Sequence, residues 1–332
     1  MTRQTLARHR RDVHLAPRQR GAALLMAMLT VALVATLASA ALWRQWRNVE
    51  VEASERSRMQ AGWILSGALD WARLILREDA RAGGPDHLGE PWSVPLQESR
   101  LSAFLAMDPS QTDASDDVFL SGQITDAQAR MNIRNLVAEG KVSEPDQQAF
   151  ARLFELLGLE PSEVDTVAAN LRLALDTAPE TGKDVSVPLV PRRPEQIPWL
   201  GLSDASLRVL APYITILPSR TPLNLNSASA EALAASIPGL DLTDARGLVA
   251  ARERSPFRAL AEVSRFLPPE TPALGAEQFS VGTRYFDVRG RLRMEQLVVE
   301  ERSLLQRNGM DTALLWRERS VPLGALAAPV GR

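Results

Sequence analysis

The residue types that most often carry out chemistry are scarce in this chain. It has no cysteine and only three histidines, of which His9 and His14 lie in an arginine-rich N-terminal segment. Zinc–thiolate sites and cysteine nucleophiles are therefore excluded. A serine–histidine–aspartate triad would have to use the remaining histidine, His87. Since His87 lies in a Gly- and Pro-rich segment, residues 83–95, we expect it to be a solvated loop residue.

The other chemical patterns are incomplete. The sequence contains no G-x-S-x-G, H-E-x-x-H or G-x-G-x-x-G motif. Gly140-Lys141 imitates the end of a phosphate-binding loop, but Asn135 stands at its first glycine and Val142 at its final Ser or Thr. We expect the acidic pair Asp116-Asp117 to form a charged turn. These observations predict that the protein is not an enzyme.

Charge is distributed unevenly along the chain. Residues 1–21 hold six arginines and one acid, whereas the rest has 32 basic and 39 acidic side chains and a net charge of −7. A body of this charge has no overall attraction for nucleic acid. Residues 21–43 then form an uncharged, apolar run of 23 residues. As a helix it would span about 34 Å, enough to cross a bilayer core of roughly 30 Å.

Three interpretations of the apolar run remain open. It can be a helix of the buried core, although such a helix rarely follows a basic, unpatterned segment. It can belong to a secretory signal peptide cleaved after Ala40, because Ala38-Ser39-Ala40 is a small-residue cleavage motif. It can follow a prepilin-type leader that is cut between Gly21 and Ala22, which leaves the apolar helix on the mature chain. By the positive-inside rule, the arginines then hold the N-terminus in the cytoplasm.

The sequence after the run favours the prepilin-type interpretation. Residues 44–80 contain no proline and continue with helical periodicity, since Ile64, Ala68, Trp71 and Ile75 recur at spacings of four, three and four. We therefore expect one continuous helix. Its first half would lie in lipid, and its second half would pack on a globular domain through those four side chains.

The start of this helix suggests a role for its side chains. Ala22, Ala23, Met26 and Ala27 are apolar and mostly small, which allows close helix–helix approach in lipid. Most pilin-like proteins carry a glutamate at the fifth residue of the mature chain, which must be neutralised in lipid by the amino terminus of a neighbour. Counted from Ala22, that residue is Met26. A subunit without this carboxylate suits a filament tip, and a plain apolar anchor explains Met26 equally well.

The body of the chain alternates between strand and helix character. Val118–Ile124 and Arg130–Ile133 read as two strands joined by a turn at residues 125–127. Helices follow over about residues 143–158 and 161–176, with a proline-rich loop over 177–203.

A second helical unit covers residues 221–267. Asn226 or Ser227 is expected to cap a helix that ends at Ser236, and Thr243 a helix that ends at Arg254. This pattern resembles a helix-hairpin-helix, in which backbone N–H groups hold DNA phosphates.

The charges near its turn argue against DNA. Asp241 and Asp244 lie in or beside the turn, where they would repel a phosphate. We instead expect the arginines of the unit to form a protein-facing surface. These are Arg246, Arg252, Arg254 and Arg258.

Strand character returns at the end of the chain. We expect strands over Phe279–Val288, Arg291–Glu301 and Ala313–Arg319, with a turn at Gly290. A helical block, about residues 137–276, separates these strands from the earlier ones. The fold class predicted is therefore α+β: a long N-terminal helix packed on a small antiparallel sheet, with an inserted all-α region.

Together these features resemble the minor pseudopilin K family of type II secretion systems. The Arg20-Gly21-Ala22 junction and Met26 carry part of the resemblance. The segment SGQITDAQARMNIRNL (121–136) is similar to the family's G-x-I-x-D-x-Q-G-R-x-N-x-N-N-L pattern, although Ala129 replaces the usual glycine. LNLNSAS (223–229) is similar to the family's N-x-N-T-A.

The resemblance implies a pilin-like domain with inserted SAM-like helical domains. The expected parts are a prepilin-type leader (1–21), a transmembrane helix (22–43), the first part of the pilin-like domain (44–136), a first SAM-like domain (137–220), a second SAM-like or helix-hairpin-helix domain (221–276), the final strands (277–320) and a tail (321–332).

The resemblance also implies partners and, in many members, a metal. The partners are the minor pseudopilins I and J, the prepilin peptidase and inner-membrane lipid, with no nucleic acid. Many members bind calcium through a D-W-x-D-x-D run and a later G-A-E. The matching region here, residues 171–187, retains Asp176 alone. Calcium takes six to eight oxygen ligands, so we expect no cofactor.

The sequence thus predicts a minor pseudopilin that initiates and caps a periplasmic pseudopilus for protein secretion across the outer membrane. It would be a single-pass inner-membrane protein with a cytoplasmic N-terminus and a periplasmic globular part. The alternative is a soluble exported helix-hairpin-helix protein, released by cleavage after Ala40, that binds nucleic acid.

Overall fold

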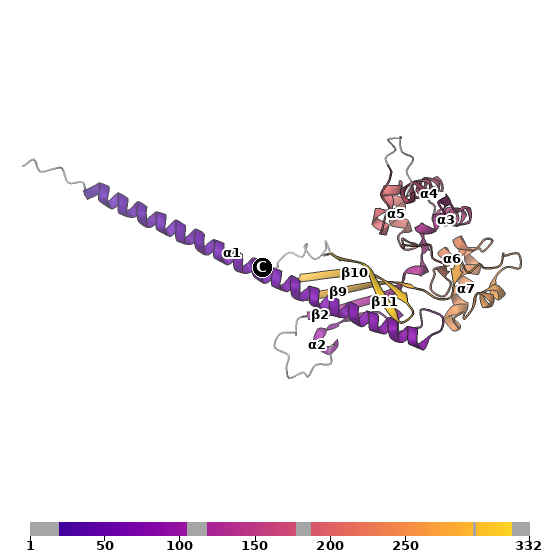
Figure 1. Cartoon of the computed structure of the whole chain (residues 1–332). Helices are drawn as coiled ribbons and strands as arrows, with labels where there is room; N and C mark the ends of the chain where they lie inside the picture. Colours follow the sequence, from indigo (N-terminus) through magenta and orange to yellow (C-terminus); the bar gives the residue numbers. More distant parts are fainter. Residues whose placement is uncertain (1–19, 105–117, 177–186, 295–296, 321–332) are drawn as a thin grey trace, which may run out of the picture. The chain divides into compact units, whose positions relative to one another are not determined.

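A computed structural model describes residues 20–104, 118–176, 187–294 and 297–320. The chain divides into two compact units, Met1–Gln60 and Ala61–Arg332. One helix, α1 (Arg20–Ala82), forms the described part of the first unit and continues into the second (Figure 1). The expected leader before residue 20, the pair Asp116-Asp117 and the tail from residue 321 lie outside the described residues.

The first unit consists of helix throughout its described part. Side chains from Ala22 to Gln60 are exposed, apart from the half-buried Ser57. The most apolar 18-residue window of α1 has a mean hydropathy of 2.2, and none of it is buried. Among the described residues, α1 is the one helix long and apolar enough to cross a membrane. The continuous helix is confirmed, and the interpretation of its apolar run as a buried core helix is wrong.

The second unit contains a five-stranded sheet with the strand order β1-β2-β9-β10-β11, in which every neighbouring pair is antiparallel. The strands are β1 (Leu96–Arg100), β2 (Val118–Asp126), β9 (Tyr285–Met294), β10 (Leu297–Asn308) and β11 (Asp311–Ser320). Sequence-distant strands are therefore neighbours, since β2 pairs with β9. Together with the helices described below, this sheet confirms the α+β class.

The C-terminal half of α1 packs on this sheet, and Figure 1 shows the helix running beside β2, β9 and β10. The buried side chains of α1 are Ala61, Leu65, Leu69, Ala72 and Leu76. Each buried leucine of this kind stabilises the fold by about 1.5–3 kcal/mol. The buried stripe of α1 lies about one residue further along the helix than the stripe predicted from the sequence. Ile64, Ala68 and Ile75 are half-buried at its edges, and Trp71 is 42% exposed.

Two strand predictions need correction. The expected hairpin of Val118–Ile124 with Arg130–Ile133 does not form, because β2 pairs with β9, and β3 (Met131–Asn132) pairs in parallel with β6 (Ile214–Thr215). The expected turn at Gly290 is also wrong. Gly290 lies within β9 directly opposite Gly122 of β2. The strand predicted at Ala313–Arg319 is confirmed as part of β11.

Helices fill the segment between β2 and β9. They are α3 (Glu144–Leu156), α4 (Ser162–Leu175), α5 (Asp204–Leu210), α6 (Ala230–Ser236), α7 (Leu242–Arg254) and α8 (Leu260–Val263), with a short α2 (Leu101–Phe104) before β2. The 3-10 helices are η1 (Pro91–Ser93), η3 (Ala127–Ala129), η4 (Ile133–Leu136), η5 (Pro194–Leu200) and η6 (Ser264–Phe266). The predicted loop over 177–203 thus contains η5, and its residues 177–186 lie outside the described chain.

One continuous cluster of buried side chains joins these helices. It includes Phe150 and Leu153 of α3 together with Leu233 of α6 and Leu248 of α7. Two further small strand pairs lie beside them. These are β4 (Val137–Ala138) with β5 (Lys141–Val142), and β7 (Leu223–Asn224) with β8 (Phe279–Ser280).

Candidate functional site

The residues predicted to be cut and to pack in lipid lie at the beginning of α1. The described part of α1 starts at Arg20 and includes the Gly21-Ala22 bond. Ala22, Ala23, Met26 and Ala27 are all exposed, Met26 at 67%. Within the described first unit, these side chains therefore present an unbroken apolar surface to their surroundings.

The few polar side chains of the apolar segment are satisfied inside the helix. The hydroxyls of Thr30, Thr36 and Ser39 donate to the carbonyls of Ala27, Leu33 and Ala35 at 2.9, 2.9 and 2.8 Å. An unpaired polar group costs several kcal/mol in hydrocarbon, so this internal pairing is what a membrane span requires.

An aromatic and basic girdle follows the apolar segment. The ring centroids of Trp43 and Trp46 lie 5.5 Å apart. The guanidinium carbon of Arg47 lies 5.9 Å from the Trp43 centroid, within cation–π range. Amphipathic rings beside cations are typical of the bilayer–water interface.

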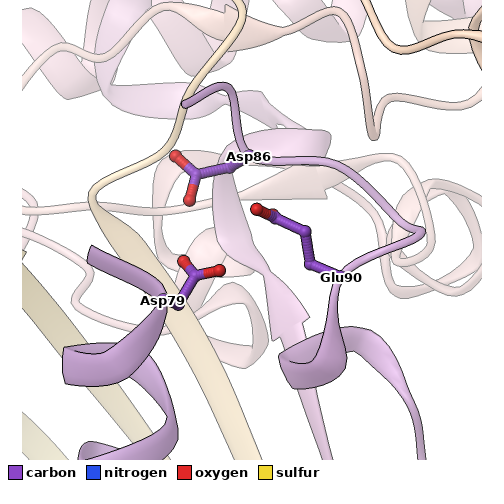
Figure 2. A group of neighbouring side chains, drawn as sticks. All are labelled: Asp79, Asp86 and Glu90. Atoms are coloured by element: carbon purple, nitrogen blue, oxygen red, sulfur yellow. The ribbon is translucent and has the colours of Figure 1, made fainter. Parts of the chain in front are cut away.

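In the second unit, three carboxylates converge at the C-terminal end of α1. Asp79 belongs to the last turns of α1, whereas Asp86 and Glu90 belong to the loop that follows it. One carboxylate oxygen from each lies within 4.8 Å of the others. Figure 2 shows the three side chains turned toward one another. No pattern in the sequence singled them out, because only the fold brings them together.

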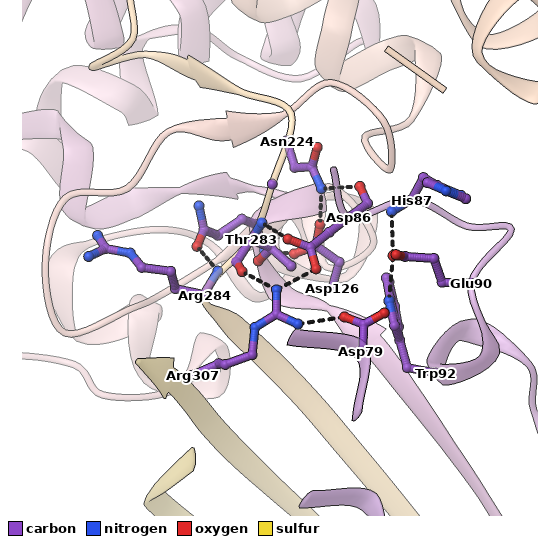
Figure 3. A network of polar contacts seen from close by, with 12 residues as sticks. Asp79, Asp86, His87, Glu90, Trp92, Asp126, Asn224, Thr283, Arg284 and Arg307 are labelled. Carbon is purple, nitrogen blue, oxygen red and sulfur yellow. Dashed lines mark hydrogen bonds and ion pairs between the residues drawn. The ribbon is translucent and has the colours of Figure 1, made fainter. Parts of the chain in front are cut away.

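Arg307 of β10 neutralises part of this negative charge. Its guanidinium donates to Asp79 at 2.6 Å, to the carboxylate of Asp86 and to the Thr283 carbonyl at 3.1 Å (Figure 3). Asp86 also accepts from the Thr283 N–H at 2.7 Å. Burial raises the pKa of the Asp86 carboxyl, against the opposing effect of Arg307. The loop after α1 is thereby tied to β10.

Glu90 is held on the other side of the cluster. Its Oε2 accepts from the His87 backbone N–H at 2.8 Å and from the Trp92 indole N–H at 2.7 Å. Burial, followed by the nearby charges of Asp79 and Asp86, raises the pKa of Glu90 to about 7. Arg307 and partial protonation of Glu90 near neutral pH therefore reduce the negative charge of the cluster.

A second buried carboxylate connects this cluster to the helical region. Asp126 accepts from the Ser227 hydroxyl at 2.5 Å, the Asn224 amide at 2.8 Å and the Gln128 N–H at 2.7 Å. Asn224 also donates to the Asp86 carbonyl at 3.0 Å. Burial raises the pKa of Asp126. The two segments quoted for the family resemblance, 121–136 and 223–229, therefore meet at Asp126 and Asn224 (Figure 3).

The other polar residues of these segments also bond across the fold. The Gln128 amide donates to the Pro222 carbonyl at 2.9 Å and accepts from the Arg284 N–H at 2.8 Å. Asn132 donates to the Ser219 carbonyl at 2.8 Å. Asn226 exchanges two hydrogen bonds of 2.9 Å with the backbone of Phe257. These side chains form hydrogen bonds with backbone groups of distant segments and so hold those segments together.

The described acidic residues give a poor fit to calcium, and residues 177–186 of the region matched to the family's calcium motif lie outside the described chain. The one group of three or more acids close enough to share a cation, in the described part of the chain, is Asp79, Asp86 and Glu90. Arg307 pairs with two of the three, whereas calcium takes six to eight oxygen ligands. Asp176 is the exposed C-cap of α4 and is not a member of this group.

The two helices predicted within residues 221–267 form as α6 and α7, with different caps. Ser229 rather than Asn226 or Ser227 caps α6, with a hydrogen bond of 3.2 Å to the Ala232 N–H. Asp241 rather than Thr243 caps α7, accepting from the Asp244 N–H at 2.8 Å. A carboxylate therefore holds the N-terminus of α7, where a DNA phosphate would otherwise bind.

One of the four arginines expected on a protein-facing surface is buried. Arg252 is 7% exposed and donates to the Leu225 carbonyl at 2.7 Å. Burial lowers its pKa to about 10. Arg246, Arg254 and Arg258 are exposed.

The remaining residues considered for chemistry have local structural roles. His87 is half-buried, and its Nδ1 accepts from the Gly89 N–H at 3.1 Å. Gly140-Lys141 belongs to the tight β4–β5 connection, where Glu139 and Gly140 have positive φ angles of 49° and 74°. Such a pair of angles is a hairpin turn and does not cradle phosphate.

Comparison with known proteins identifies the family of this chain. The chain is 30% identical to the Type II secretion system protein K of Pseudomonas aeruginosa over 344 residues, covering 94% of this chain and 95% of that protein. The chain belongs to the type II secretion system protein K family. The protein of the same name from Klebsiella pneumoniae is 30% identical over 92% of this chain and 97% of its own length.

Family models and a solved structure agree with this membership. Two models described as Type II secretion system (T2SS), protein K match residues 129–219 and 223–282 of the chain. A chain in the crystal structure of the GspK-GspI-GspJ complex from enterotoxigenic Escherichia coli has the same fold, with a TM-score of 0.61 and 19% identity. The similarity covers 80% of this chain and 98% of that one. The matched ranges contain Asn224 and residues 129–136, whereas Asp126 lies just before them.

Proposed function

We propose that this chain is a minor pseudopilin that initiates and caps the tip of a periplasmic pseudopilus. The observation that carries the proposal is the exposed apolar start of α1, in which Met26 stands at the fifth position counted from Ala22. A carboxylate at that position would have to be neutralised by a subunit ahead of it. A subunit with methionine there needs no such neighbour, so it can occupy the end of a filament.

The same segment supports processing and anchoring. A prepilin peptidase would cut between Gly21 and Ala22, and the apolar helix would then remain in the inner membrane. The arginines before residue 21 would hold the N-terminus in the cytoplasm, which leaves the second unit in the periplasm. The internally paired hydroxyls of Thr30, Thr36 and Ser39 support a lipid environment for this segment.

The partners in this proposal are the minor pseudopilins I and J of the same secretion system. The solved complex with the same fold contains proteins named GspI and GspJ. In this role the chain need not catalyse a reaction or bind a cofactor. The buried polar residues that the family segments share form hydrogen bonds within the fold, which supports a structural role.

The test is assembly of the full chain in detergent with the minor pseudopilins I and J. We expect a ternary complex with one copy of each protein, and antibody labelling of assembled pseudopili at one end only. A chain that binds neither partner, or that labels filaments along their whole length, contradicts the proposal.

A matched pair of variants tests the role of Met26. Met26→Glu supplies the carboxylate of an internal subunit, and Leu29→Glu places the same charge one turn later in the helix. We expect Met26→Glu to permit incorporation at internal positions and Leu29→Glu not to do so. Strictly terminal labelling for Met26→Glu would argue that Met26 has no part in the end position.

A further inference from the structure

A cavity of ≈ 340 Å³ lies at the end of β2, within the second unit. Four successive residues of β2 line it, from Gln123 to Asp126. Since successive side chains point to opposite faces of a strand, a cavity that touches all four runs along the edge of β2. Its other walls come from the loop after α1, from Ala129 and Arg130, from Arg289 of β9 and from the helical region.

The edge of β2 is open along this cavity. The last paired position between β1 and β2 is Leu96 opposite Gly122, and residues 123–125 pair with β9 alone. Backbone groups of alternate residues in this stretch point away from β9. No other segment of the described chain forms a backbone hydrogen bond with them. A strand edge of this kind can accept an extended peptide as an additional strand.

A half-buried arginine beside this edge has unused hydrogen-bond donors. The side chain of Arg130 is 15% exposed, and its guanidinium forms one hydrogen bond with the described residues, a long one of 3.3 Å from Nη2 to Asp287. Asp287 is held more closely by Arg302, which donates to it at 2.6 and 2.9 Å. The Nε and Nη1 atoms of Arg130 have no described partner and are not sealed from solvent. They are therefore free to donate to a ligand.

The charges at this site leave one positive charge without a counter-ion. Arg130, Arg289 and Arg302 surround the buried Asp287, with N–O distances of 3.3, 3.8 and 2.6 Å. The one further acid that pairs with these arginines, in the described chain, is Glu195, 3.1 Å from Arg302. Three arginines thus face two acids. A carboxylate ligand would neutralise the excess, whereas a phosphate dianion would exceed it.

One acid of the cavity wall already has its own partners. Asp126 accepts hydrogen bonds from the Ser227 hydroxyl, the Asn224 amide and the Gln128 N–H. Burial raises the pKa of Asp126, which favours its neutral form. Asp126 therefore adds little repulsion toward a ligand with one negative charge.

Apolar side chains form another part of the wall. Leu88 and Trp92 belong to the loop after α1, Ile124 to β2, and Pro212 to the segment after α5. Leu88 is 55% exposed, so a ligand can reach this surface from solvent. Apolar surface beside two guanidinium groups suits a carboxylate that is attached to an apolar side chain.

We propose that this cavity binds the C-terminal residue of a polypeptide whose last residues add as a strand to the open edge of β2. The terminal carboxylate accepts hydrogen bonds from Arg130 and Arg289. The last side chain is apolar and lies against Leu88 and Trp92. The preceding residues pair through their backbone with residues 123–125. This interaction is separate from the proposed tip role and does not depend on Met26.

The test is fluorescence anisotropy of labelled hexapeptides added to the full chain in phospholipid nanodiscs. The peptides end in leucine with a free carboxylate, and their other five positions are randomised. The control is the same peptide pool with a C-terminal amide. We expect saturable binding of the free acid and about tenfold weaker binding of the amide, because the amide loses charge-assisted hydrogen bonds. Equal affinity of the two pools, or no saturable binding of the free acid, overturns the proposal.

A matched pair of arginine variants locates the site. Arg289 and Arg291 lie on the same face of β9, and their side chains are 59% and 56% exposed, but Arg291 does not line the cavity. We expect Arg289→Gln to weaken binding of the free acid about tenfold and Arg291→Gln to leave it unchanged. Equal effects of the two variants overturn the site, since they would indicate unspecific attraction to a basic surface.

Competition with N-acetyl-leucine separates the carboxylate from the strand. This molecule carries the terminal carboxylate and the apolar side chain but has too little backbone to pair along residues 123–125. We expect it to displace the labelled peptides about tenfold less effectively than an unlabelled hexapeptide does. Equal potency overturns the addition of a strand and identifies the site as one for small carboxylates.

Discussion

The side-chain amide of Asn224 donates to the carboxylate of Asp126 at 2.8 Å, although 98 residues separate them in sequence. Both groups are buried, and each belongs to a segment that resembles the family pattern. The contact joins the end of β2 to β7 in the helical region. Asn224 also reaches the Asp86 carbonyl, so the same amide connects the loop after α1.

Asn224→Ala is expected to destabilise the fold. The substitution removes three side-chain hydrogen bonds, to the Asp86 carbonyl, the Asp126 carboxylate and the Asn226 N–H, and leaves the buried carboxylate of Asp126 with one partner fewer. We expect a loss of about 1–3 kcal/mol. Chemical denaturation of the full chain in detergent measures the free energy of unfolding. Asn308→Ala, at an exposed position of β10, is the matched control and should stay within about 0.5 kcal/mol of the wild type. If the two variants lose the same free energy of unfolding, the buried hydrogen bonds of Asn224 do not stabilise the fold.

Glu90 is expected to make stability depend on pH. Its pKa is raised from 4.5 to about 7 in the folded chain. The folded chain thus binds this proton more tightly than the unfolded chain. The contribution of Glu90 to stability is therefore fully present below about pH 4.5 and is lost as the pH rises to about 7.

Glu90→Gln isolates this contribution, because glutamine still accepts a hydrogen bond and carries no charge. Thermal unfolding of both proteins is compared between pH 5 and pH 8. We expect the variant to gain in melting temperature relative to the wild type as the pH rises. A difference between the two proteins that does not change with pH would refute the assigned titration.

Calcium is expected to leave the chain unaffected. Arg307 pairs with Asp79 and Asp86, and Asp176 is not a member of any acidic cluster of the described residues. Addition of a chelator such as EGTA, or of millimolar calcium, should therefore not change the melting temperature of the full chain. A rise in melting temperature that saturates with calcium concentration would contradict this expectation, since a ligand that binds the folded state stabilises it.

The fold class and most single elements were predictable from local patterns. The long apolar run, the helical periodicity of α3 and α4, and the alternation in β11 are all properties of neighbouring residues. Strand pairing was not predictable in this way. The alternating pattern of Val118–Ile124 predicts a strand. Its partner strand β9 begins at Tyr285, and no local pattern identifies that partner.

Two errors have the same physical origin in tertiary packing. Gly290 is a turn residue by type, yet it lies within β9 because Leu65 of α1 packs closely above it. Trp71 fits the helical period of the core-facing stripe, yet Leu69 and Ala72 take the buried positions. The cluster of Asp79, Asp86 and Glu90 was missed, because its counter-ion Arg307 comes from β10, more than two hundred residues later.

The apolar half of α1 carries the central claim, and the N-terminus of the mature chain tests it most directly. Mass spectrometry of the protein purified from membranes of cells that contain a prepilin peptidase identifies its first residue. We predict Ala22, with the segment from Ala22 to Trp43 retained and the protein extracted by detergent only. A mature chain that begins at Ala41 and is soluble without detergent would contradict the account.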